Sequence, residues 1–146
     1  ADTASISADL LLVRRQIARE VLERIAGARR LDTAPIVAAV EQLRRVVDEG
    51  GTVDAIAEAD LEIARALVAA TGSEVLQLCM NPIVHLVGSL AGLRAAMFRH
   101  PKRNVAAYDA LLLWLARRDR RLLPAVFEVL ARADLATLRA LTRRKR

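Results

Sequence analysis

The sequence has few of the residues that build metal centres and disulfides, and few aromatic residues. Its 146 residues include one cysteine, two histidines, two phenylalanines, one tryptophan and one tyrosine. The single cysteine, Cys79, excludes an internal disulfide, and its apolar neighbours favour an inert thiol in the protein core. His85 and His100 are too few to supply the three or four protein ligands of a zinc site.

Catalytic motifs are missing as well. The sequence contains no glycine-rich phosphate loop, no HExxH, no CxxC and no serine nucleophile elbow. Glu58, Asp60 and Glu62 form an acidic run, but on a helix Glu58 and Glu62 point away from the face of Asp60. Because nothing supplies a nucleophile, a base and an oxyanion donor together, the sequence argues against an enzyme.

The net charge of +6 comes largely from the last four residues, 143–146, which read RRKR. Such a tail could contact nucleic acid, although a solvated chain end explains it as well. No signal-peptide pattern opens the chain, so the sequence favours a cytoplasmic protein. The first residue is Ala1, which fits either a processed protein or a fragment.

What the chain does contain is apolar residues at helical spacing. Hydrophobic residues make up 54% of it, and few β-branched runs alternate with period two. We therefore expect an all-α protein, an antiparallel bundle of six to seven helices forming one domain over residues 1–146. The expected helices are 6–26, 33–49, 52–71, 74–99, 105–117 and 120–142, with a basic loop at 100–104.

Residues 75–93 contain no charged side chain, although 27% of the whole chain is charged. A helix that is apolar on every side is either the central helix of a bundle or a membrane span. Asn81, Pro82 and His85 would be costly in lipid, so a buried central helix with a kink at Pro82 is favoured. In that position Asn81 and His85, one turn apart, would face the interior and indicate a ligand cavity.

A carboxylate is also expected inside the bundle. Asp60 follows Ile56 by four residues and precedes Ile63 by three, so it shares their inner face. A buried carboxylate is costly unless a partner compensates it. Asp60 could instead reach solvent at the edge of that face or pair with an arginine.

Several segments follow one another in the order and spacing of a known family. They read DLLLVR from Asp9, DLEIA from Asp60, ATGS over residues 70–73 and YDALL from Tyr108. The family pattern reads D-x-x-F-H, then S-G-N, then H-R-x-I-L-x-A-L-x-x-G-D. Over about residues 8–142 the chain resembles the C-terminal effector-binding domain, or FCD domain, of FadR-type regulators in the GntR family.

The resemblance implies an all-α, homodimeric domain that binds a small-molecule effector and shifts the packing of its helices. Operator DNA would be bound only through a winged-helix domain, which has no counterpart in this chain. Many members of the family bind a divalent metal through one Asp and three His. Here the matching positions hold Asp60, Ala64, Tyr108 and Leu130, so we predict neither a metal nor another cofactor.

Apolar residues in place of histidines suit an acyl chain, so the resemblance favours acyl-CoA or a fatty acid as the effector. Metal-independent sensing of another carboxylate is the alternative. Arg14 matches an arginine that faces the effector carboxylate in some relatives, unless it is a solvated neighbour of Arg15. The predicted effector-binding residues are Arg14, Asp60, Asn81, His85 and Tyr108.

Two other hypotheses belong to different classes. The bundle could be a degenerate sensor that serves only as a structural adaptor, with a filled interior. It could also be a small membrane protein built on residues 75–93, although the polar residues there argue against a membrane partner.

Overall fold

The computed structural model describes residues 2–144, so Lys145 and Arg146 of the basic tail lie outside the described residues. Within that range the chain forms helices and no strand, which confirms an all-α bundle. The helices are α1 (Thr3–Gly27), α2 (Ala34–Asp48), α3 (Val53–Ala70), α4 (Glu74–Ser89), α5 (Ala91–Met97), α6 (Pro101–Arg117), the 3-10 helix η1 (Arg120–Leu122) and α7 (Leu123–Arg143).

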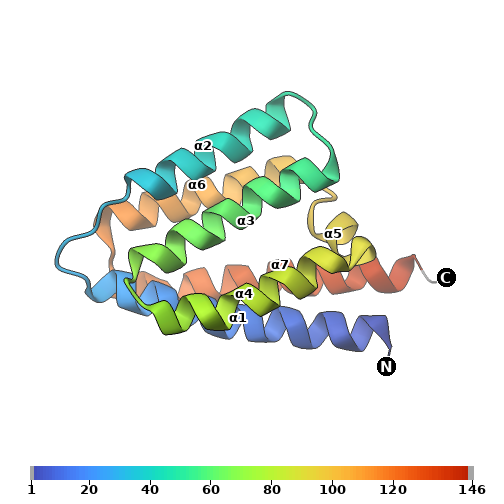
Figure 1. Ribbon diagram of the computed structural model, residues 1–146, viewed down its shortest axis with the longest axis horizontal. Helices are drawn as coiled ribbons and strands as arrows, with labels where there is room; N and C mark the ends of the chain where they lie inside the picture. The colour runs from blue at the N-terminus through green and yellow to red at the C-terminus, as the bar shows by residue number, and fades with distance from the viewer. Residues whose placement is uncertain (1, 145–146) are drawn as a thin grey trace.

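The helices are arranged about α3, which packs against α2, α4, α5 and α1. Helix α6 packs on α2, whereas α7 packs on α1 and α5. Figure 1 shows α2 and α6 on one side of α3 and the group of α1, α4 and α7 on the other. Both chain ends lie at the same end of the bundle (Figure 1).

Local side chains account for where several of the helices begin. The side chain of Asp2 accepts a hydrogen bond from the Ala4 amide at the start of α1, at 3.2 Å. Thr52 and Ser73 cap α3 and α4 in the same way. Pro101 opens α6, where its missing N–H would have had no helical partner. The expected basic loop at 100–104 is therefore wrong, because residues 101–104 form the first turn of α6 and His100 precedes it as the N-cap.

The helix expected over 74–99 is interrupted. Leu90 has extended backbone angles, φ −98° and ψ 92°, and the axes of α4 and α5 differ by 95°. Pro82 lies inside α4, so the sharp bend occurs at Leu90 and not at the expected position of the kink. Proline interrupts one hydrogen bond of the helix, but the abrupt change in direction comes from the extended residue.

The core consists of two apolar clusters that meet at Leu67 and Leu112. One lies between α2, α3, α5 and α6 and includes the buried residues Val40, Leu43, Ile56, Ala59, Ile63, Phe98 and Val105. The other includes Val21, Leu22, Ile25, Ile36, Val68, Leu76, Met80, Trp114, Leu115 and Leu123.

Helix α4 is not the central helix that the sequence predicts. Its buried residues are Leu76 and Met80, whereas most of its other side chains are exposed. Cys79 is exposed too, so the expectation of a core thiol is wrong. Helix α3 takes the central position instead, because it has neighbours on several sides while α4 packs through one face against α1 and α3.

Within residues 2–144, no single helix is long and apolar enough to be a candidate membrane span. The pair α4 and α5 meets the length and composition criteria only when the two are joined across their 95° bend.

Candidate functional site

A buried carboxylate joins the first and last helices. Asp134 of α7 is only 3% exposed, and each of its two oxygens accepts a hydrogen bond from an arginine of α1. Arg14 Nη2 lies 3.0 Å from Oδ1, and Arg15 Nη1 lies 2.7 Å from Oδ2. The arginine side chains are 29% and 25% exposed, so they connect the interior to water. Two charge-assisted bonds offset the desolvation of the carboxylate.

A second polar pair lies between α3 and α6. The Tyr108 hydroxyl donates a hydrogen bond to Oδ1 of Asp60. Burial raises the pKa of the Asp60 carboxyl, while the Tyr108 hydrogen bond and the positive charge of Arg14 oppose that rise. The pKa of Tyr108 is raised well above its usual value by burial, and then by the negative charge of Asp60. Asp60 is therefore a partly buried carboxylate, and its hydrogen-bond partner is a tyrosine rather than an arginine.

Arg14 links the two pairs electrostatically. It holds Asp134 through a hydrogen bond, and its charge also acts on Asp60 and Tyr108. We define the polar cluster as Arg14, Arg15, Asp60, Tyr108 and Asp134, which come from α1, α3, α6 and α7. Three of the five residues predicted to bind an effector therefore belong to one cluster. Arg14 therefore contacts Asp134 directly and acts on Asp60 and Tyr108 only through its charge.

The structure does not bring Asn81 and His85 into the polar cluster. Both are exposed on α4, so the expectation that they face the interior is wrong. Helix α4 packs through Leu76, Met80 and Val84, which recur every four residues on one side. Each helical residue turns about 100° from the previous one, so Asn81 and His85 lie beyond the edge of that packed side.

The remaining positions of the family's metal site hold apolar residues at partly buried places, Ala64 on α3 and Leu130 on α7. Within residues 2–144 there is no group of three or more His, Cys, Asp or Glu that could hold a metal ion. Asp60 and Tyr108 supply two oxygen atoms in contact, which falls short of a four-ligand shell. The metal-free site remains a prediction.

Sequence analysis missed Arg15 and Asp134 as members of the site. A signal was available for Asp134, because it interrupts the inward row of Phe127, Leu130, Leu138 and Leu141 in the last helix. A carboxylate on an apolar stripe requires a partner, by the same argument that singled out Asp60. What the spacing could not supply was the partner, since Arg14 is 120 residues away in the chain.

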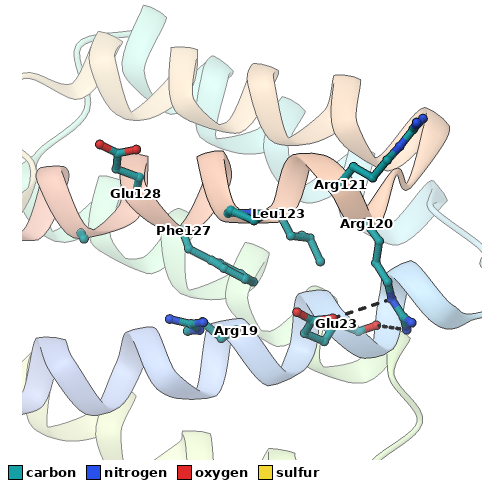
Figure 2. Close-up of a pocket in the computed structure, with 9 residues that line it drawn as sticks. Arg19, Glu23, Arg120, Arg121, Leu123, Phe127 and Glu128 are labelled. Atoms are coloured by element: carbon teal, nitrogen blue, oxygen red, sulfur yellow. Dashed lines mark hydrogen bonds and ion pairs between the residues drawn. The ribbon is translucent and has the colours of Figure 1, made fainter.

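Two surface hollows lie away from the polar cluster. A groove of about 250 Å³ between α3 and α4 is lined by Arg65, Val68, Ala69, Gln77, Met80, Asn81 and Val84. A wider one of about 610 Å³ lies between α1 and the start of α7 (Figure 2). In it the Arg19 guanidinium sits 4.7 Å from the centre of the Phe127 ring, and Arg120 pairs with Glu23 at 3.7 Å. Neither hollow is lined by Arg14, Asp60 or Tyr108.

Comparison with known families places this geometry in context. The family model described as the FCD domain matches residues 9–128. The match takes in Arg14, Asp60 and Tyr108 and ends before Asp134. No curated protein and no solved structure matches the chain.

Proposed function

The chain belongs to the FCD family, whose domains are the effector-binding domains of GntR-family transcription regulators; we propose that it senses an anionic effector at the polar cluster. The observation that carries this proposal is the buried Asp134 carboxylate held by Arg14 and Arg15. Two arginines that bind a carboxylate of the same chain can bind the carboxylate of a ligand with the same geometry.

In this proposal the effector competes with Asp134. Its carboxylate would take the place of the Asp134 oxygens on Arg14, and the polar ends of Asp60 and Tyr108 would orient it. The Tyr108 hydroxyl, which donates to Asp60 in this structure, could donate to the effector anion instead. Loss of the contact between α1 and α7 would then couple binding to a change in helix packing.

A fatty acid or acyl-CoA is the favoured effector, because the chain has the apolar residues Ala64 and Leu130 at two positions that match the family's metal-binding histidines. A smaller carboxylate, sensed without a metal, is the alternative. Homodimerisation, operator binding through a winged-helix domain and action in the cytoplasm belong to the same proposal. The resemblance to FadR-type regulators implies the dimer and the winged-helix domain, and the lack of a signal-peptide pattern favours the cytoplasm.

One observation favours a second function, that of a structural adaptor. The polar cluster is already satisfied within the chain, and both surface hollows lie elsewhere. A bundle that served only as an adaptor would keep these contacts in every state and would bind no effector at Arg14.

Arg14→Gln is expected to weaken binding of a fatty acid such as decanoate by about 10- to 100-fold, since a hydrogen bond to a charged group contributes about 1.5–3 kcal/mol. Thermal shift and titration calorimetry on the wild-type and variant proteins would measure the change. Decanol, which has the same chain without the charge, should give a much smaller shift. Arg44→Gln is the matched control, because Arg44 pairs with Asp109 on the surface. A flat response of the folded wild type to fatty acids, acyl-CoAs and small carboxylates would support the adaptor instead.

Asp134→Asn is expected to have the opposite effect on the same ligands. Asparagine keeps a hydrogen-bond acceptor for the arginines but removes the charge that competes with the effector carboxylate. Decanoate should therefore bind more tightly than to the wild type, by roughly tenfold if about 1.4 kcal/mol of competition is removed. Unchanged affinity in a variant with native helix content would show that Asp134 does not compete with the ligand.

A further inference from the structure

The exposed side of α4 is the largest departure of the structure from what the sequence predicts. Val75, Leu78 and Leu86 are 68%, 70% and 47% exposed. Successive separations of three, four and four residues place Val75, Leu78, Pro82 and Leu86 on one face of the helix. We define the α4 outer face by the exposed residues Val75, Leu78, Cys79, Pro82, Leu86 and Ser89.

This face lies opposite the packed side of the same helix. Leu76, Met80 and Val84 pack against the core, so α4 is apolar on both sides. A helix that is apolar all round is normally covered all round. Within residues 2–144 the chain covers one side of α4 and leaves the other to solvent. The sequence pattern and the structure agree if a second molecule covers the outer face.

We propose that the occupant of the α4 outer face is a second copy of this chain, packed α4 against α4 about a twofold axis. This inference rests on the homodimer of the proposed function and assigns it a surface. A twofold interface is self-complementary, so the same face serves both subunits.

Charge is what favours a second copy. The protein carries a formal charge of +6, so two copies repel each other wherever they meet through charged surface. From residue 75 to residue 93 there is no Asp, Glu, Lys or Arg, so the α4 outer face itself brings no like charges together. A partner of opposite charge would gain nothing from this face, whereas an identical uncharged face matches it.

The interface would need more than the three large apolar side chains. A stable dimer buries roughly 800 Å² on each subunit. Apart from Glu74 in the first turn, the other exposed residues of α4 are uncharged, and they are Gln77, Cys79, Asn81, Pro82, His85, Gly88 and Ser89. Gly88 has no other atoms within 4 Å of the position that a Cβ would occupy. A neighbouring backbone can therefore approach the helix closely there.

A membrane surface fits the outer face less well. Helices that lie on membranes combine an apolar face with Lys and Arg along their polar flanks. Helix α4 contains neither, and its only charged residue is Glu74 in the first turn. An uncharged apolar face on a helix without basic flanks suits association between two proteins better than binding to a membrane surface.

Leu78→Glu tests the assignment, with Leu113→Glu as its matched control. Leu113 lies on α6 and is 76% exposed, so both substitutions place one glutamate at an open leucine position. Light scattering and native mass spectrometry should find a dimer for the wild type and for Leu113→Glu. Leu78→Glu should be a monomer at the same concentration, with self-association weakened by at least about 100-fold, since an unpaired charge buried at the interface costs more than about 2.7 kcal/mol.

Cys79 gives an independent readout on the same face. Its thiol should react with a maleimide more slowly as the wild-type concentration rises, whereas its reaction in Leu78→Glu should not depend on concentration. The effect of decanoate on the melting temperature of Leu78→Glu distinguishes effector sensing from the proposed dimer interface. A retained shift in a monomer leaves effector sensing intact and supports the assigned interface.

Three results would overturn the inference. The first is a wild type that stays monomeric at high micromolar concentration. The second is a dimer that survives Leu78→Glu in a protein with native helix content, which would move the interface elsewhere. The third is binding of the wild type to anionic lipid vesicles that Leu78→Glu abolishes, which would make a membrane the occupant.

Discussion

Asp134→Ala is expected to lower the free energy of unfolding by about 3 kcal/mol, the lower end of the range for removing one partner of a buried ion pair. Alanine leaves Arg14 and Arg15 facing each other across the space of the lost carboxylate. The lower end applies because both guanidinium groups retain some contact with water. Urea denaturation followed by circular dichroism would measure the difference.

The matched control is Asp109→Ala, which removes the carboxylate partner of Arg44 on the surface. Asp109 and Arg44 side chains are 44% and 34% exposed, so this change should cost less than about 1 kcal/mol. If the two substitutions lowered the free energy of unfolding equally, burial would not be the reason that the Asp134 ion pairs stabilise the protein. The effector-competition model would then lose its structural basis.

Tyr108→Phe is expected to cost about 2 kcal/mol at neutral pH, within the usual range of about 1–3 kcal/mol for a buried polar group left without its partner. Phenylalanine keeps the ring of Tyr108 among its apolar neighbours and removes only the hydroxyl that donates to Asp60. In an Asp60→Asn background, Tyr108→Phe should lower the free energy of unfolding by less. A neutral amide depends less on a hydrogen bond from the hydroxyl than a carboxylate does. A double-mutant cycle on the two positions, read by urea denaturation, would give the coupling.

The pH dependence of Asp60 has a definite sign. Its pKa is raised in the folded protein, so the native state binds this proton more tightly than the unfolded chain does. The contribution of Asp60 to stability is therefore present below its usual pKa of about 4 and is lost as the pH rises through the folded-state pKa. Tyr108→Phe should raise that pKa further, because the hydrogen bond lowers it.

Comparing Asp60→Asn with the wild type isolates this effect, since titrations common to both proteins cancel. Relative to the wild type, the variant should gain stability across the interval in which Asp60 ionises and keep that gain at neutral pH. A difference in unfolding free energy that stayed constant from pH 3 to pH 8 would show that the ionisation of Asp60 is not coupled to folding.

The positions of the helices were largely readable from apolar spacing, and their ends mostly from short-range chemistry. The order of the segments and their approximate limits followed from that spacing and from the glycines and capping residues between them. The errors occurred at Leu90 and at Pro101, where one extended residue divides a helix and a proline begins one. Both depend on single backbone conformations, which hydrophobic spacing does not encode.

The site was readable in part. Asp60 was identified by its place on an apolar stripe, and Arg14 and Tyr108 by the family resemblance. Asn81 and His85 were predicted to face the interior because residues 75–93 lack charge, which was taken to mean that the helix is buried within the chain. Both residues are exposed. Absence of charge shows that a helix avoids solvent or charged neighbours, but it does not show which molecule covers it.

The sequence by itself determined that this chain is helical, that it lacks catalytic motifs and that it resembles the FCD family, which the family match to residues 9–128 shows. These conclusions depend on residue types and on spacings of a few positions along the chain. Only the tertiary structure decided that α3 is central, that α4 presents an apolar face outward, and that Asp134 meets Arg14 and Arg15. Contacts between residues more than a hundred positions apart depend on how the helices pack, and several packings satisfy the same helical pattern.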